Sequence, residues 1–218
     1  MNQLELSEII VSTLNSKQIR MFCPPSIEYE NLKKLDISLL KTLYLYSLSE
    51  GEEVFDDIEY FINISKNSEI NLENCLTDPR IERIYKKAKQ VRREIHRIKG
   101  FLRFKEIGGC YLYGPIQPDF NIIMPLSVYF SNRLRNEKIL IHDTKRRVVT
   151  FCHKGKIYLA KIESRLPDLT SEEQEISYLW RKYFDKISIK ERFNKKIQRQ
   201  KVPLKYRSTM TEFMEKIE

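Results

Sequence analysis

Residues 78–100 have the sequence DPRIERIYKKAKQVRREIHRIKG, which carries the clearest helix pattern in the chain. Asp78 is a natural N-cap, and Pro79 stands at the first helical position, where its missing N–H costs nothing. Apolar side chains recur at steps of three and four, as in a helix that buries one face. They are Ile81, Ile84, Tyr85, Ala88, Val91, Ile95 and Ile98. Gly100 is predicted to end the helix.

The other side of this predicted helix is cationic. Residues 80–105 hold 11 basic and 2 acidic side chains, whereas residues 1–79 hold 6 basic and 14 acidic ones. A second basic block, residues 181–207, repeats the count of 11 against 2. Two such blocks on a chain of net charge +9 predict a surface for a polyanion. The alternative is that each block is only the solvated face of a helix.

Beyond Gly100 the apolar period changes to that of strands. Residues 101–104 and 110–113 predict a hairpin around Gly108-Gly109. A helix is expected from Asp119 or Asn121 to about Arg135, and three strands are expected over 138–142, 148–152 and 156–162. This order of two strands, a helix and three strands predicts an α+β fold, with an antiparallel sheet and helices on one face.

Helices are predicted on both sides of the sheet. Before the long helix they span residues 7–15, 36–48 and 54–64; a break at Cys23-Pro24-Pro25 follows the first. After the sheet, residues 170–173 (TSEE) form a capping box that begins an amphipathic helix. A last short helix is expected over residues 210–217. We therefore expect one domain, residues 1–218, with a helical part (1–98), a sheet with one helix (99–165) and a basic helical part (166–218).

Composition excludes several classes of protein. No apolar run approaches the roughly 18–20 residues of a membrane span. Glu5 and Glu8 stand where a secretory signal carries Lys or Arg, so we expect a cytoplasmic protein without membrane contact. The four cysteines lack paired spacing, which favours reduced thiols. A zinc site is the weaker alternative, and its ligands would be Cys110, Cys152, His142 and His153. We expect no metal or organic cofactor.

Two short patterns could carry catalysis. Pro118-Asp119 followed by Asp143-Thr144-Lys145 fits the loose pattern of Mg²⁺-dependent nucleases, in which carboxylates hold the metal. The alternative is that Asp119 only caps a helix.

The second pattern is His142-Asp143 with Arg146-Arg147. It could grip a phosphate, with His142 and Asp143 as weak catalytic candidates, or it could be an Asp-headed turn with exposed arginines. Whether the protein is an enzyme stays open at this point.

A series of further motifs follows a fixed order along the chain, over roughly residues 36–210. They are Val91–Glu94, His96–Phe104, Pro118–Asn121, Pro125-Leu126, Tyr129-Phe130 with Arg133, Ile141–Asp143 with Arg146, Leu179–Phe184, Ile189–Arg192 with Asn194, and Gln198–Gln200 with Pro203 and Tyr206. This order, rather than any one signature, resembles a bacterial family of unknown function associated with DNA metabolism and DNA repair. The resemblance implies fusion to a uracil-DNA-glycosylase-like domain, or a gene beside that of a radical-SAM protein assigned to DNA repair. Either protein is therefore an expected partner.

These observations give the leading hypothesis of a DNA-binding accessory protein in DNA repair. The expected nucleic-acid contacts are Arg92, Arg93, His96, Arg97, Arg103, Arg146, Arg147, Lys195, Lys196 and Arg199. Tyr111, Tyr113 or Phe104 could stack on an unpaired base, although aromatic side chains on strands are more often part of the core. The alternatives are a DNA-processing enzyme that uses the His142-Asp143-Arg146 turn, and a protein-interaction scaffold with a basic face. We also expect the fold to bring the two basic blocks onto one face.

Overall fold

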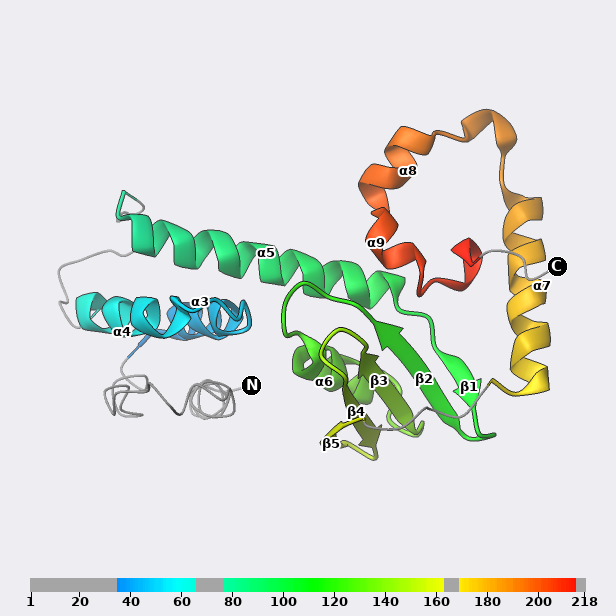
Figure 1. The fold of residues 1–218 in the computed structure, drawn as a ribbon, viewed down its shortest axis with the longest axis horizontal. Helices are drawn as coiled ribbons and strands as arrows, with labels where there is room; N and C mark the ends of the chain where they lie inside the picture. The colour runs from blue at the N-terminus through cyan, green and yellow to red at the C-terminus, as the bar shows by residue number, and fades with distance from the viewer. Residues whose placement is uncertain (1–34, 66–76, 163–168, 215–218) are drawn as a thin grey trace. The chain divides into compact units, whose positions relative to one another are not determined.

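The computed structural model describes residues 35–65, 77–162 and 169–214 (Figure 1). The predicted helix at 7–15 and the break at 23–25 lie outside the described residues. Two compact units are present, one that ends at Glu94 and one that begins at Ile95. Within the described ranges, no helix carries an apolar stretch long enough to cross a bilayer.

The first unit is helical. Helices α3 (Ile37–Ser47) and α4 (Val54–Ser65) pack with the first part of α5 (Pro79–Phe101). Asp36 caps α3 by accepting from the Ser38 backbone N–H at 3.1 Å, as predicted. Apolar faces of the three helices form the core, whose fully buried members include Leu40, Leu43, Tyr46, Ile58, Phe61 and Ile84.

The prediction for α5 is confirmed at its start and along its apolar stripe. Asp78 accepts from the backbone N–H groups of Arg80 and Ile81 at 2.8 and 3.2 Å. Every stripe residue is buried except Tyr85, which is half-buried. The predicted end was wrong by one residue, because the helix passes through Gly100 to Phe101.

The second unit is built on a five-stranded sheet in the order β1-β2-β3-β4-β5. The strands are β1 (Lys105–Ile107), β2 (Tyr111–Ile116), β3 (Ile139–Asp143), β4 (Val148–His153) and β5 (Lys156–Lys161). The predicted strand at 101–104 is wrong, because Phe101 is helical and β1 begins at Lys105. The α+β class is confirmed.

The expectation of an antiparallel sheet is wrong for one pair of strands. β2 and β3 are parallel, with Gly114 opposite Ile141, whereas the other three pairs are antiparallel. The reason is the helix between them, α6 (Ile123–Arg133), since a crossover helix joins parallel strands and a tight turn joins antiparallel ones. The helix also begins later than predicted, after Ile122, which has no side-chain cap.

One face of the sheet packs on α6. Ser127 of α6 makes a 2.6 Å hydrogen bond with Thr150, and Phe104 packs edge-on against Phe130 at 5.0 Å. Gly114 lies beneath Phe104, where a Cβ would come within 2.8 Å of the ring. Glycine is therefore required here by close approach of the Phe104 ring.

The chain then forms α7 (Ser171–Ile187), the short helix η3 (Lys190–Arg192), α8 (Lys195–Lys201), α9 (Leu204–Arg207) and η4 (Thr211–Phe213). Figure 1 shows the chain running along α7, turning, and returning through α8 and α9. Thr170 caps α7 by accepting from the Glu173 N–H at 3.2 Å, as the capping box predicted. The last predicted helix is shorter than expected, and residues 215–217 lie outside the described part of the chain.

Strand β5 lies at the edge of the sheet. It pairs with β4 on one side, and most of its side chains are exposed. Tyr158 and Leu159 are 54% and 59% exposed, and a lysine stands at each end, Lys156 and Lys161.

Candidate nucleic-acid interface

The cationic side of α5 is exposed in both units. Arg92 and Arg93 are exposed in the first unit, and His96 and Arg97 are exposed in the second. Their positions between the buried stripe residues explain this, because a helix that buries one face leaves the intervening side chains in water.

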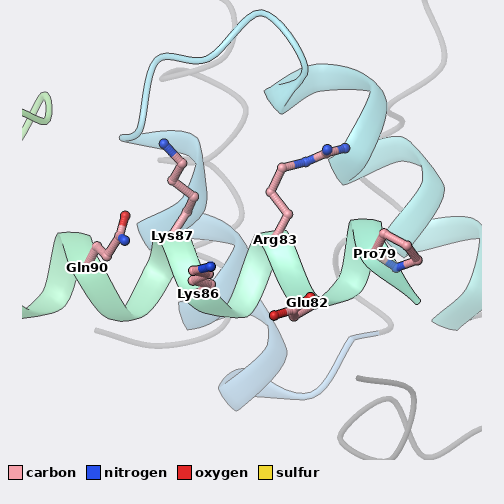
Figure 2. Close-up of a pocket in the computed structure, with 6 residues that line it drawn as sticks. All are labelled: Pro79, Glu82, Arg83, Lys86, Lys87 and Gln90. Carbon is pink, nitrogen blue, oxygen red and sulfur yellow. The ribbon is translucent and has the colours of Figure 1, made fainter. Parts of the chain in front are cut away.

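Near its start, α5 also borders a shallow hollow in the first unit (Figure 2). It is lined by Pro79, Glu82, Arg83, Lys86, Lys87 and Gln90. Arg83 donates two hydrogen bonds to the buried carboxylate of Asp57, at 2.7 and 2.6 Å, and Tyr46 donates a third at 2.5 Å. The charge of Arg83 is therefore compensated inside the protein.

Two of the predicted DNA-binding arginines are engaged within the second unit. Arg103 donates to the Glu212 carboxylate at 2.7 and 3.3 Å and to the Gly100 carbonyl at 2.8 Å. Arg146 donates to Asp143 at 2.9 Å and to the carbonyls of Pro118 and Asp119 at 3.3 and 2.9 Å. Both guanidinium groups thus donate hydrogen bonds that link separate segments of the second unit.

The turn after β3 is headed by Asp143. This carboxylate is fully buried and accepts from the backbone N–H groups of Lys145 and Arg146 at 3.0 and 3.1 Å. Arg147 follows, exposed and in the left-handed region with φ 55°. The geometry is that of the Asp-headed turn, one of the two sequence interpretations of this segment.

The nuclease-like pattern does not converge on one metal site. The carboxylate of Asp143 is occupied by Arg146, and Asp119 is paired with Lys205 of α9 rather than capping α6. The zinc alternative fails similarly, because Cys152 and His153 are consecutive strand residues and point to opposite faces. Among the described residues, no three His, Cys, Asp or Glu side chains gather as metal ligands.

His142 forms a hydrogen bond with a tyrosine on the next strand. Its Nδ1 lies 2.8 Å from the Tyr113 hydroxyl. Burial lowers the pKa of His142, while the negative charge of Asp143 acts weakly in the opposite direction, and burial raises the pKa of Tyr113. At neutral pH the imidazole is therefore uncharged, and its tautomer decides whether Nδ1 accepts from the Tyr113 hydroxyl or donates to it. Asp143 points to the α6 face, so the two neighbours form no catalytic dyad.

The face of the sheet opposite α6 is rich in aromatic rings. Phe151 is central to it, at 6.2 Å and nearly parallel to Tyr158, at 6.3 Å from His153 and at 6.1 Å from Tyr111. The Tyr113–His142 pair, with ring centroids 5.9 Å apart, lies on the same face. These side chains are half-buried or, for Tyr158, exposed. We call Tyr111, Tyr113, His142, Phe151, His153 and Tyr158 the aromatic face.

Cations lie at the edge of the aromatic face. Lys138 Nζ stands 5.4 Å from the centre of the Tyr111 ring. Lys156 is exposed and is paired with His153 in the β4–β5 register. At strand β1 this side of the sheet is covered rather than exposed. Lys105 and Ile107 are buried there, and α7 packs on β1.

Two of the three rings predicted to stack on a base, Tyr111 and Tyr113, lie on the aromatic face. Phe104 was also a candidate, but it packs on α6 at the opposite face. Phe151 and Tyr158 were missed, although the alternation Val149, Phe151, His153 could have indicated them once their register with β5 was known.

The second basic block is exposed in α8. Lys195, Lys196 and Arg199 point to solvent, and Asn194 caps the helix by accepting from Ile197 N–H at 3.0 Å. Farther along, Tyr206 of α9 packs against Phe101 at the end of α5, with ring centroids 5.5 Å apart. The last residues of the first block and the end of the second therefore meet within the second unit.

A family model described as a domain of unknown function, DUF4130, matches residues 52–212. The chain belongs to this family. No curated protein and no solved structure matches the chain. The DUF4130 match spans the sheet, α5 and α8, so the aromatic face and all ten predicted DNA-binding residues lie inside it.

Proposed function

We propose that this protein binds single-stranded or locally unpaired DNA, as an accessory module in DNA repair. The observation that carries the proposal is the aromatic face, in which Phe151 and Tyr158 stack in near-parallel on the side of the sheet away from α6. Base–aromatic stacking is worth about 1–3 kcal/mol per base and tolerates any base, since each base has a π-face.

The cations supply the second part of the affinity. Lys138 and Lys156 lie beside the aromatic face, and α8 adds exposed Lys195, Lys196 and Arg199 in the same unit. Lys and Arg contacts to phosphates are independent of sequence and release counterions, so binding by this route weakens with salt. Arg103 and Arg146 are left out of the proposed interface because their guanidinium groups bind protein acceptors.

A repair setting is supported by the resemblance to a family associated with DNA metabolism. In that setting a uracil-DNA glycosylase or a radical-SAM repair protein would act on the strand that this protein holds. The enzyme alternative is not put forward, because His142 and Asp143 point to opposite faces of the sheet. A scaffold with a basic face, needing no nucleic acid, would show no binding in the experiment that follows.

The test is fluorescence anisotropy with a labelled single-stranded oligonucleotide and the matching duplex. We expect tighter binding of the single strand, and Tyr158→Ala should weaken it by about 5- to 100-fold, as expected when one base no longer stacks on a ring. The matched control is Tyr178→Ala on α7, because Tyr178 is a similarly exposed tyrosine, 47% against 54%. It should leave affinity unchanged. Absence of single-strand binding at low salt would exclude the proposal.

A further inference from the structure

Helix α7 turns its apolar side chains to solvent. Five of them recur at helical spacing on one side and are between 43% and 59% exposed. They are Ile176, Leu179, Trp180, Tyr183 and Ile187. We call these five residues the α7 stripe. Contiguous apolar surface of this kind on a folded protein marks an interaction site.

The side of α7 that contacts the rest of the unit is a different one. Glu173 accepts from the Glu106 backbone N–H at 3.0 Å and from Ser177 at 3.0 Å, and Ser177 is buried. Phe184 packs on Phe213 at 6.2 Å. At 100° per residue, Glu173, Ser177 and Phe184 share one side of the helix, and the α7 stripe is centred roughly a quarter turn away. The helix is thus anchored, and none of the described residues covers its stripe.

Charge along α7 is segregated. Glu172, Glu173 and Glu175 lie in the first five residues, whereas Arg181, Lys182 and Lys186, with Asp185 among them, lie in the last seven. An antiparallel copy of the same helix sets the acidic half of each against the basic half of the other. A two-fold axis perpendicular to the helices produces this arrangement, and two-fold dimers are the commonest oligomers.

We infer that the α7 stripe is the interface of a homodimer, in which α7 packs antiparallel against α7 of a second copy. Aromatic side chains bury roughly 150–250 Å² each. With ten half-exposed stripe side chains, the pair would bury on the order of 1,000 Å², close to the lower end of specific interfaces. Interfaces at this small end of the range are typical of weak, transient complexes, so we expect a dimer that dissociates on dilution.

Trp180 makes the inference testable, because it is the single tryptophan of the chain and lies in the α7 stripe. Light scattering and Trp180 emission would be followed over about 1–100 µM protein, the range expected for so small an interface. We expect the mass to double and the emission to shift to shorter wavelength together. Leu179→Glu should abolish both changes. Val128→Glu, at an exposed apolar position of α6 (46%), is the matched control and should keep both.

A charge exchange tests the antiparallel orientation. Glu172→Lys with Glu175→Lys gives both halves of α7 a net positive charge, and Lys182→Glu with Lys186→Glu in a second chain makes the helix largely acidic. Each variant alone should dimerise about threefold or more weakly, and an equimolar mixture should recover the dimer. Circular dichroism checks that α7 stays helical.

Three outcomes would overturn the dimer. They are a monomeric mass at the highest concentration, a dimer that persists in Leu179→Glu, and a blue shift of Trp180 caused by added oligonucleotide without doubling of the protein mass. Failure of the charge-exchanged mixture to recover would overturn the antiparallel arrangement.

Discussion

The guanidinium of Arg146 lies 2.9 Å from the fully buried carboxylate of Asp143 and also donates to the carbonyls of Pro118 and Asp119. One side chain thus joins the turn after β3 to the loop that follows β2. Since β2 and β3 are parallel, both segments begin at the carboxyl ends of neighbouring strands. Arg146 links the two segments there, and we assign it a structural role rather than contact with DNA.

Arg146→Ala is therefore expected to destabilise the protein by about 3 kcal/mol, because it leaves the Asp143 charge buried without its partner. Arg147→Ala is the matched control, since Arg147 is the exposed neighbour in the same turn, and it should cost about 0.5 kcal/mol or less. Urea unfolding of the two variants measures both values. Equal, small losses would show that the ion pair does not hold the turn.

Charge reversal in α8 should change the salt dependence of DNA binding. If about 4–6 phosphates are contacted, the log–log slope of affinity against salt is near −4 to −5 on duplex DNA and roughly −3 to −4 on single strands. Reversing Lys195, Lys196 and Arg199 to Glu should flatten the slope by about 1 for each phosphate that the variant no longer binds. All three side chains are exposed, so the melting temperature should stay nearly constant.

Tyr158→Ala should behave in the opposite way, lowering affinity at every salt concentration while keeping the slope, because stacking releases no counterions. If the α8 reversals leave the slope unchanged, phosphates are bound elsewhere. If Tyr158→Ala flattens the salt slope, the Tyr158 ring contributes to affinity indirectly, by positioning the cations that bind phosphates.

His142 should make stability depend on pH. Burial lowers the pKa of His142 in the folded protein, so the unfolded chain binds its proton more readily. The free energy of unfolding is then highest above the ordinary histidine pKa of about 6.5 and falls as the pH drops from there toward the folded-state pKa. Below it, both ring nitrogens of the imidazolium are donors, so Nδ1 can only donate to the Tyr113 hydroxyl.

Unfolding curves between about pH 7.5 and about pH 5 would measure this slope. His142→Gln should reduce it, whereas Tyr113→Phe should keep most of it, because burial contributes more to the shift than any other cause. His96→Gln, at an exposed histidine of α5, is the control. The same slope in wild type and His142→Gln would exclude His142 as its source.

Local signals in the sequence predicted the helices well. Asp78 and Thr170 act as caps, and the α5 stripe is buried where the three- and four-residue spacing indicated. Such signals depend on a few neighbouring residues, and tertiary contacts did not overrule them. The strand predicted over residues 101–104 was wrong, because Phe101 and Phe104 pack against different elements rather than forming one face of a strand. Phe101 packs on Tyr206, and Phe104 packs on Phe130.

The site was harder to predict because it depends on pairing between distant segments. Phe151 and Tyr158 become neighbours only through the β4–β5 register. Arg103 and Arg146 resemble the exposed arginines in sequence, and only their partners Glu212 and Asp143 distinguish them. The uncovered α7 stripe was equally invisible, since an amphipathic pattern indicates which side is apolar but not whether the same chain covers it.

The two lysines that end β5 have a consequence for handling the protein. An edge strand presents unpaired backbone N–H and C=O groups, and Tyr158, Leu159 and Ala160 give this one an apolar centre. Such a strand can pair with a strand of another chain and so start aggregation. Lysines on the strand oppose this pairing, because each added chain would bring like charges together. Lys156 and Lys161 therefore act as gatekeepers against fibrous aggregation, a safeguard that high salt would weaken during concentration or crystallisation.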